Sequence, residues 1–527
     1  MSDARPLPKW LPTVGVAIAL AGLVALSFVE RWTLLNQSPY PVGVDGYFYP
    51  VQLRALLETG SLQYPAAPLA LWLMAPLAAL TDPITGAKLG AALFGALVAL
   101  PAYGVGARLG RCRGAGLVAA VLATTSAGSA FLTIEFVKNG IGLTMLLTAV
   151  WLLLRALEKP THARIALAVA GGVLAVLAHK MAAAMLVAFA VPAIVAAAAG
   201  HGKLRGRRLL YTIAIVGGIP ILLLVLGIAF PKRLPSLGEF DLGAALFAND
   251  SHWLAPALVT RNVTLTFGHE ALVGAILGIA GAVVLANRQA LERVRLPASI
   301  LGEPTRRAFP GETAVACTVI AFAIAIAWPR LDVTDAQGLG FRLRVAAYVP
   351  MALAAAIVAG RLLSRIKHRD FILAIVAVVL ATRTPGHRDE GRIQAHPAMV
   401  AAIYALANHV RGANASESVE IPRADTIIVP ERHIVFMVAW YTRANVRIRP
   451  EAVAPEHRWR LMPLAWTGMG SALDKALLEA RNGPRPPLGL HPRHPNGIVL
   501  VHESTYQRVL DALPADVRAH WSRWRTI

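Results

Sequence analysis

The amino-acid sequence predicts a mainly α-helical, polytopic membrane protein with a small α/β domain at its C-terminal end. Three observations support this fold class. Of the 527 residues, 56% are hydrophobic and only 15% are charged, whereas a soluble domain averages about 25% charged residues. Runs such as 13–29 and 209–229 carry no charge over most of the thickness of a bilayer. From about residue 384 onwards the chain becomes more polar, and helical and strand patterns alternate.

The apolar runs predict a helical bundle of about eleven transmembrane helices. About 20 apolar residues are enough to cross the hydrocarbon core of a membrane. One further run, 67–81, is apolar but short, so we interpret it as an interfacial or re-entrant segment. The predicted spans are 10–29, 86–107, 114–134, 139–157, 164–179, 181–199, 209–229, 269–287, 312–328, 343–360 and 371–383.

The loops between these runs indicate the orientation of the chain. With the N-terminus inside and the spans alternating, every inside loop is rich in Arg and Lys, as cytoplasmic loops are. The outside loops then collect most of the acidic residues. The first run follows Arg5 and Lys9 and shows no small-x-small cleavage site before Glu30, which indicates an uncleaved signal anchor. We expect an integral protein of a bacterial inner or plasma membrane with a cytoplasmic N-terminus.

An odd number of spans places the C-terminal part on the outer side of the membrane. Residues 1–383 are predicted to form the transmembrane domain, and residues 384–527 a soluble extracytoplasmic α/β domain. In the second domain, 425–430 and 497–502 have the pattern of buried strands. The helical patterns of this domain cover 399–411, 431–441, 471–481 and 504–513.

Several function classes are not indicated. The net charge of +21 does not predict a nucleic-acid partner, because the excess basic residues of the membrane part lie in short loops between apolar runs. Cys112 and Cys317 are predicted near the cytoplasmic ends of helices, so we expect neither a disulfide nor a thiolate metal site. The sequence contains no phosphate-binding glycine loop, zinc motif or nucleophile elbow.

The first outer loop contains the first candidate residues for a working site. Asp45 precedes a stretch, 46–58, with an amphipathic helical pattern that carries Tyr47, Tyr49 and Arg54. Such a helix would lie along the membrane surface, and its N-terminus would favour a carboxylate. A catalytic carboxylate and a simple cap of this helix are equally good interpretations of Asp45.

Two short outer turns add further ionisable residues. Glu135 and Lys138 lie in one turn, and His179 and Lys180 lie in the other. Ionisable groups at this depth usually line a polar cavity. A snorkelling lysine and a histidine bonded to a backbone carbonyl are the ordinary alternatives.

Two arginines begin a later helix at the outer rim, against the usual distribution of positive charge. Arg342 and Arg344 suit an anionic ligand such as a phosphate, whose oxygens match the guanidinium fork. The alternative is a salt bridge to Asp332 or Asp335.

Five segments carry a family resemblance through their order and spacing. They read "VDGYFYPVQLRALLETGSL", "YPAAPLALWLMAPLAAL", "GAKLGAALFGALVALPAYGVGARLG", "IEFVKNGIGLTMLLTAVWLLLRALE" and "LAHKMAAAMLVAF". The arrangement resembles the GT-C glycosyltransferases, polytopic enzymes that take a sugar from a polyprenyl-phosphate carrier outside the membrane. It is similar to bacterial relatives of the protein O-mannosyltransferases (glycosyltransferase family 39) and to lipid A aminoarabinose transferase. The resemblance covers 10–200 well and 201–383 only by pattern.

The resemblance implies roles for the outer residues. Asp45 takes the place of the family's presumed catalytic aspartate, and Glu135 lies nearest to its second acidic position. Three basic residues would bind the donor phosphate: Arg342, Arg344 and Lys180. The substrate cavity would be lined by Tyr47, Tyr49, Arg54, Lys138 and His179.

This sequence also departs from the family pattern. Many relatives have two adjacent acids in the first loop, but here Gly46 follows Asp45. Lys138 alone replaces the arginines that usually lie near the second acid. The tryptophan-rich acceptor motif of oligosaccharyltransferases is missing, since "LAWTGMG" (464–470) does not match it. Transfer of oligosaccharide to asparagine is therefore not expected.

The sequence thus predicts an integral membrane glycosyltransferase that moves a hexosyl or pentosyl unit from a polyprenyl-phosphate-linked donor to a lipid, glycan or protein acceptor. Asp45 would act as general base on the acceptor hydroxyl. No cofactor is expected. A divalent metal would suit this chemistry but is not predicted, because no dense carboxylate cluster is visible. The alternatives are a transporter or flippase for a lipid-linked or anionic substrate, whose usual internal symmetry we do not find, and a non-catalytic scaffold.

Overall fold

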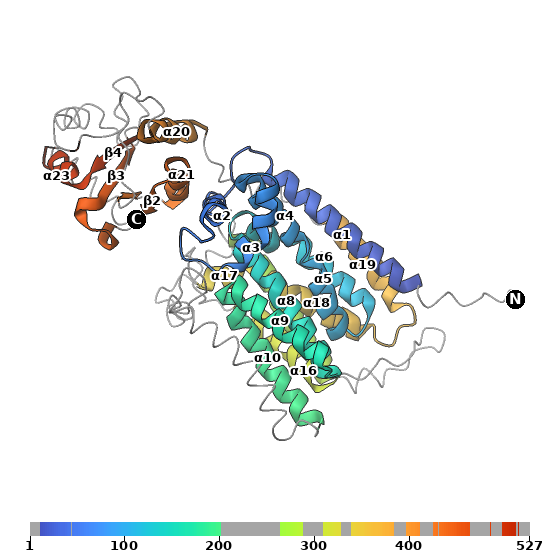
Figure 1. Cartoon of the computed structure of the whole chain (residues 1–527). Coiled ribbons are helices and arrows are strands. Elements are labelled where there is room, and N and C mark those ends of the chain that lie inside the picture. The colour runs from blue at the N-terminus through green and yellow to red at the C-terminus, as the bar shows by residue number, and fades with distance from the viewer. Residues whose placement is uncertain are drawn as a thin grey trace. The chain divides into compact units, whose positions relative to one another are not determined.

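The computed structural model describes most of the chain and divides it into two compact units. The first unit comprises residues 1–37 and 55–391, and the second comprises 38–54 and 392–527. Helices dominate the first unit, and the second contains a small sheet (Figure 1). The described residues are 11–43, 45–201, 264–287, 309–327, 339–383, 397–411, 425–429, 432–448, 450–463, 485, 498–512 and 515.

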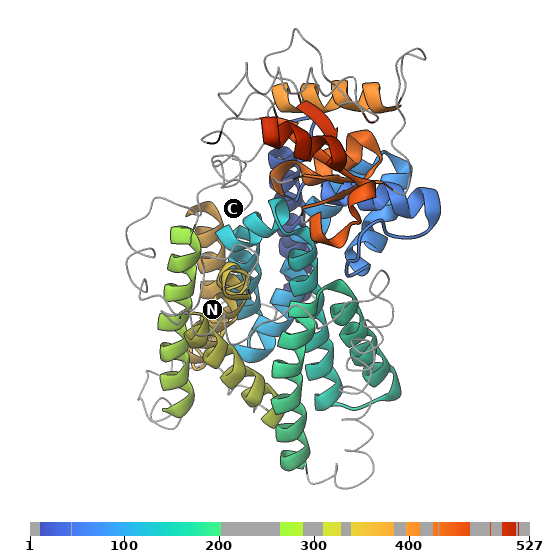
Figure 2. The ribbon, with the colours of Figure 1, turned by 90° about the vertical axis from the view of Figure 1, so that its left-hand side faces the viewer.

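The first unit is a bundle of apolar helices, with α8, α9 and α10 side by side (Figure 1, Figure 2). Helix α2 (Phe48–Thr59) begins in the second unit and ends in the first. The remaining helices of the bundle are α1 (Leu11–Leu35), α3 (Leu69–Leu80), α4 (Pro83–Ala96), α5 (Ala99–Leu109), α6 (Arg113–Thr125), α7 (Ala127–Ile134), α8 (Val137–Glu158), α9 (His162–Ala178), α10 (Lys180–His201), α14 (Thr264–Ala286), α16 (Pro310–Ile326), α17 (Leu339–Val345), α18 (Tyr348–Leu362) and α19 (Arg369–Arg383).

Helix is found at every predicted span except 209–229, which lies outside the described residues. Among the described residues, six helical stretches are long and apolar enough to cross a membrane, or seven if the bent pair α6–α7 is one span. Helices α3, α9 and α16 are apolar but shorter. The prediction of a polytopic helical fold is confirmed, and the number of eleven spans stays a prediction.

Local sequence signals explain where several helices begin. Asp82 precedes α4, and its carboxylate accepts hydrogen bonds from the N–H groups of Ile84 (2.8 Å) and Thr85 (3.0 Å). Pro83 occupies the first turn of that helix, where the missing N–H costs nothing. Thr161 caps α9 in the same way, accepting from the N–H of Arg164 at 3.3 Å. These caps satisfy N–H groups that a helix start leaves without partners.

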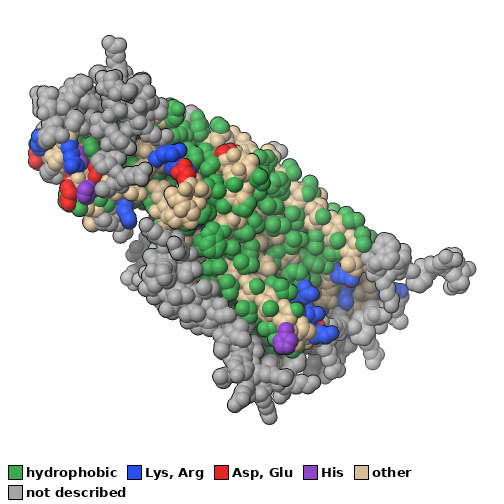
Figure 3. Space-filling model, in the orientation of Figure 1, with side chains coloured by type: hydrophobic (Ala, Val, Ile, Leu, Met, Phe, Trp, Pro, Cys, Tyr) green, Lys and Arg blue, Asp and Glu red, His purple; other side chains and the backbone are tan. Residues whose placement is uncertain are grey.

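Small residues allow the bundle helices to approach closely. An added Cβ at Gly106 of α5 would lie 2.5 Å from the Cβ of Ala119 on α6, and one at Gly360 of α18 would collide with the backbone of Gly110. Such contacts are typical of membrane helices, where packing replaces the hydrophobic driving force. Large apolar side chains point outward instead, for example Ile18, Leu26 and Phe371. Hydrophobic side chains cover much of the visible bundle surface (Figure 3), as expected for contact with lipid.

The second unit contains a four-stranded sheet of order β2-β1-β3-β4. Strand β1 (Thr426–Ile428) is parallel to β2 (Asn445–Arg447) and β3 (Arg458–Pro463), and β3 is antiparallel to β4 (Ile498–His502). Helix α20 (Pro397–Arg411) packs on α21 (Arg432–Thr442), and α23 (Glu503–Ala512) packs on β3 and β4. The short 3-10 helices η2 (Pro450–Ala452) and η3 (Pro455–His457) precede β3. The predicted α/β class of this part is confirmed.

Candidate functional site

Helix α7 is the central element of the candidate site in the first unit, and it is fixed at its start. Helices α6 and α7 meet at a bend of 46° at Ser126. The buried Arg31 of α1 connects both sides of this bend. Its guanidinium donates to the carbonyl of Thr124 (2.9 Å), to Ser129 Oγ (2.8 Å) and to Thr133 Oγ1 (3.1 Å). A buried guanidinium is tolerated when its donors are satisfied, so these bonds hold α7 against α1.

A carboxylate of α14 reinforces the start of α7. Glu270 accepts hydrogen bonds from the N–H groups of Ala127 (2.7 Å) and Gly128 (3.1 Å). A carboxylate at a helix N-terminus is favoured by the free N–H groups and by the helix dipole. At the opposite end, the buried Glu135 is the residue on which α7 terminates, with its N–H bonded to the carbonyl of Phe131 at 2.8 Å. The predicted acidic residue is therefore held at a rigid helix end.

His179 lies in the extended turn between α9 and α10 and is 6% exposed. Its Nδ1 accepts a hydrogen bond from the N–H of Met181 at 3.1 Å. This bond places the proton of the neutral ring on Nε2. Gly142 of α8 leaves room for the histidine, because an added Cβ there would lie 2.8 Å from the Cβ of His179.

Three cations lie close enough to this histidine to act on its charge. The charges of Arg342, Lys138 and Lys180 all act on the ring of His179. Arg342 comes from α17, Lys138 from α8 and Lys180 from α10, so three separate helices bring positive charge to one neutral ring. A group of cations around a neutral hydrogen-bond donor suits an anionic ligand. We call Arg342, Lys138, Lys180 and His179 the cation cluster.

Aromatic rings form a wall beside the cation cluster. The guanidinium carbon of Arg342 lies 5.6 Å from the centre of the Phe136 ring. Phe131, Phe136 and Phe341 pack against one another with ring centroids 5.8–6.3 Å apart. Arg344 lies two residues after Arg342 on the same short helix. Asp332 and Asp335, the alternative partners of these arginines, lie outside the described residues.

The first-loop residues Asp45, Tyr47, Tyr49 and Arg54 belong to the second unit. Helix α2 starts at Phe48, and the carbonyl of Asp45 accepts a hydrogen bond from the N–H of Phe48 at 2.9 Å. The predicted amphipathic pattern does not hold over the first half of this helix, because Gln52 is as buried as its apolar neighbours. Burial and the hydrogen bond to Tyr441 raise the pKa of Tyr47, so its hydroxyl stays protonated and cannot serve as a base.

The glycine that follows Asp45 has a steric cause. A Cβ added at Gly46 would lie 2.5 Å from the carbonyl oxygen of Val42 and 3.0 Å from that of Gly43. The N–H of Gly46 also bonds to the carbonyl of Gly43 at 3.1 Å. This tight turn leaves no space for the second acidic side chain that the family pattern leads one to expect.

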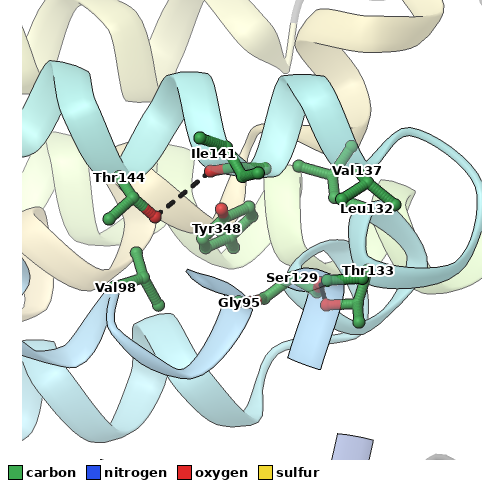
Figure 4. A pocket seen from close by; sticks show the side chains of 11 residues that line it. Gly95, Val98, Ser129, Leu132, Thr133, Val137, Ile141, Thr144 and Tyr348 are labelled. Atoms are coloured by element: carbon green, nitrogen blue, oxygen red, sulfur yellow. Dashed lines mark hydrogen bonds between the residues drawn. The ribbon is translucent and has the colours of Figure 1, made fainter. Parts of the chain in front are cut away.

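A small pocket lies between α4, α7, α8 and α18, and sequence reasoning did not identify it (Figure 4). Hydroxyl groups of Ser129, Thr133, Thr144 and Tyr348 line it among apolar side chains. Its size suits about one water molecule, which is too small for a sugar. In the sequence, the signal that could have pointed to this pocket is the presence of serine and threonine residues in α7 and α8. Elsewhere in the described part of the chain, no three His, Cys, Asp or Glu side chains are grouped so that they could hold a metal ion.

Comparison with solved structures shows a similar fold. The crystal structure of ArnT from Cupriavidus metallidurans bound to undecaprenyl phosphate matches with a TM-score of 0.51 and 13% sequence identity, over 91% of this chain and 97% of that chain. An oligosaccharyltransferase from Archaeoglobus fulgidus, in complex with zinc and sulfate, gives a TM-score of 0.47 and 12% identity over 86% and 69% of the two chains. No family model and no curated protein matches the sequence. The predicted resemblance to an aminoarabinose transferase is thus confirmed for the fold.

Proposed function

We propose that this chain is a GT-C-type membrane glycosyltransferase that moves a sugar from a polyprenyl-phosphate-linked donor to an acceptor at the outer face of the membrane. The cation cluster is the observation that carries the proposal. Lys138, Lys180 and Arg342 bring positive charge to a neutral, buried histidine inside an apolar helical bundle. Charges at such a position are costly and serve an ionic ligand or pathway in most membrane proteins.

A lipid-linked phosphate suits this cluster in both charge and location. Arg342 offers a planar fork for phosphate oxygens, and the two lysines add point charges. The proton on Nε2 of His179 makes the ring a neutral donor. The solved structure with a similar fold, ArnT, is described with bound undecaprenyl phosphate. We extend that ligand class, a polyprenyl phosphate, to this chain.

The proposed reaction needs a base and a stabilised leaving group. Asp45 removes the proton of the acceptor hydroxyl as that oxygen attacks the anomeric carbon, and the bond from that carbon to the phosphate oxygen breaks. The polyprenyl phosphate departs with the electron pair and gains negative charge, which Arg342, Arg344 and Lys180 stabilise. A positioned general base contributes about 10²–10⁴-fold in rate. Glu135 is the second proposed acidic residue of the site.

The orientation in this proposal follows from the charge distribution along the sequence, and the remaining parts follow from the family resemblance. The protein lies in a bacterial inner or plasma membrane with its N-terminus in the cytoplasm, and residues 384–527 form an extracytoplasmic domain. The transferred unit is a hexose or pentose, and the acceptor is a lipid, a glycan or a protein. The chemistry as written needs no metal ion.

A transfer assay with purified protein tests this function. The protein in detergent is incubated with radiolabelled polyprenyl-phosphate sugars and a membrane extract that contains acceptors, and the loss of label from the donor is measured. We expect donor consumption by the wild type and none above background by Asp45→Asn. Glu58→Gln, which changes an exposed carboxylate later in α2, is the matched control and should stay active. Full activity of Asp45→Asn would remove Asp45 from the mechanism.

The same preparation separates the enzyme from a flippase. Protein reconstituted into liposomes either consumes the labelled donor or only moves it between the two leaflets. Translocation without donor consumption would overturn the proposed function in favour of a transporter.

A further inference from the structure

The segment that carries Asp45 packs into the same compact unit as the C-terminal domain. Residues 38–54 join residues 392–527 in the second unit, although more than three hundred residues separate them in the sequence. Tyr47, Phe48 and Arg54 all contact one helix of that unit, α21. These contacts comprise a pair of hydroxyl groups, a pair of aromatic rings and a bond from a guanidinium to a carbonyl. Because the three kinds of contact need different partners, the pairing is specific.

Arg54 binds the C-terminal end of α21. Its guanidinium donates to the carbonyl of Trp440 at 2.7 Å and to that of Ala439 at 3.1 Å. Because α21 ends at Thr442, both carbonyls belong to its last turn, and the carbonyl of Ala439 also accepts a hydrogen bond from the N–H of Arg443 at 3.1 Å. A cation at this end is also favoured by the helix dipole. The same guanidinium lies 4.5 Å from the centre of the Trp440 ring, which adds a cation–π contact.

Aromatic side chains extend this contact toward Asp45. The hydroxyl groups of Tyr47 and Tyr441 lie 3.2 Å apart, and their ring centroids are 5.8 Å apart. Phe48 packs edge-on against Phe436 with ring centroids 5.0 Å apart. Edge-on aromatic pairs add a favourable electrostatic contact to the burial of the two rings.

Backbone hydrogen bonds connect the Asp45 turn to these anchored residues. The N–H of Phe48 bonds to the carbonyl of Asp45 at 2.9 Å, and the N–H of Val51 bonds to the carbonyl of Tyr47 at 3.2 Å. The turn itself is closed by the bond from Gly46 to Gly43. The residues that contact α21 therefore follow Asp45 directly in the sequence and are hydrogen-bonded to its backbone.

We propose that α21 of the C-terminal domain positions Asp45 for the transfer reaction, with Trp440 and Tyr441 as the positioning residues. This inference rests on the proposed function, because it assigns the second unit a part in the chemical step. Neither side chain needs to touch the donor. The cation cluster belongs to the first unit, so the proposal separates donor binding from the alignment of the base.

Steady-state kinetics and hydrogen exchange together test this role. In Trp440→Ala, we expect kcat to fall by about 10- to 100-fold, because a misplacement near 1 Å costs about 10²-fold. The KM for the polyprenyl-phosphate sugar should stay at the wild-type value. Amide hydrogens of residues 45–54 should exchange faster in this variant. Trp440→Phe, which keeps an aromatic ring over Arg54, should recover most of the kcat.

A second tryptophan of the same domain supplies the matched control. Trp459 of β3 is buried, donates to Asp425 at 2.9 Å and packs edge-on against His502 with ring centroids 5.2 Å apart, so these contacts lie within the C-terminal residues. Trp459→Phe should lower the stability of the domain but leave kcat and the exchange of 45–54 unchanged. An equal loss of kcat in Trp459→Phe, or unchanged kcat in Trp440→Ala, would overturn the positioning role. A wild type that transfers no sugar would instead overturn the proposed function, and the positioning role with it.

Discussion

Replacing Arg342 with Gln tests the phosphate-binding role of the cation cluster. A polyprenyl-phosphate sugar carries one negative charge on its phosphodiester, and the departing polyprenyl phosphate gains a second. A nearby cation therefore stabilises the transition state more than the bound donor. Two unit charges about 5 Å apart attract by about 3 kcal/mol at an effective dielectric constant of about 20. This energy corresponds to a factor of about 10² in rate.

The expected result for Arg342→Gln is a fall in kcat/KM of about 30- to 100-fold, because Lys138 and Lys180 still supply charge. The loss should appear partly as a raised KM, from the charge already present in the donor, and partly as a lowered kcat. Arg342→Lys keeps the charge without the planar fork and should lose less. The assay is donor consumption by purified protein over a range of donor concentrations.

Arg155 offers a matched control. It lies on the same bundle and stacks over Trp151 at 5.4 Å, much as Arg342 stacks over Phe136 at 5.6 Å. Arg155→Gln therefore removes the same chemical group from a similar aromatic contact outside the cation cluster, and it should keep the wild-type kcat/KM. If Arg342→Gln keeps it too, or if both variants lose it equally, the cluster does not bind the donor phosphate.

Two further predictions address stability and the candidate site. Arg108→Met removes the ion pairs of Arg108 with Glu158 (2.7 Å) and with the buried Glu312 (3.1 Å). Unfolding in detergent should become easier by about 1.5–3 kcal/mol, the usual contribution of a hydrogen bond to a charged group. A cost under about 1 kcal/mol would mean that these pairs behave as exposed ones. Gly46→Glu should lower both Tm and transfer activity, because the Cβ of the glutamate would lie 2.5 Å from the carbonyl oxygen of Val42. A variant with wild-type Tm and activity would disprove this steric argument.

Hydropathy and charge were sufficient to predict the positions of the helices, because a membrane imposes the same length and composition on each span. They could not predict where helices break. The run 114–134 was expected to be one helix, but it bends by 46° at Ser126. The bonds that define this bend come from Arg31, on another helix, and from Glu270, 143 residues along the chain from Ala127. The composition of residues 114–134 does not indicate which distant residues will bond to this segment.

In the candidate site, too, the sequence predicted features that depend on local composition and missed those that depend on distant residues. Lys138, His179, Lys180 and Arg342 were selected from separate loops by their predicted side of the membrane, and the structure brings them together. The first loop was treated as part of the membrane domain, whereas the structure groups residues 38–54 with the C-terminal residues. Aromatic side chains on both partners, together with Arg54, produce that association. Their pairing depends on a fold of the C-terminal domain that the sequence alone did not predict in detail, including strands β2 and β3.

The membership of residues 38–54 in the second unit affects how the chain is made. The ribosome synthesises Arg54 long before Trp440, with which it bonds across 386 positions of sequence. At about 5–20 residues per second, this gap corresponds to roughly 20–80 seconds of translation. Throughout that interval the aromatic residues 47–49 have been synthesised, but α21 has not. The second unit therefore cannot be completed during synthesis of the helical bundle. A chain shortened to the membrane-spanning region would keep Phe48 and Arg54 while losing the helix that they contact.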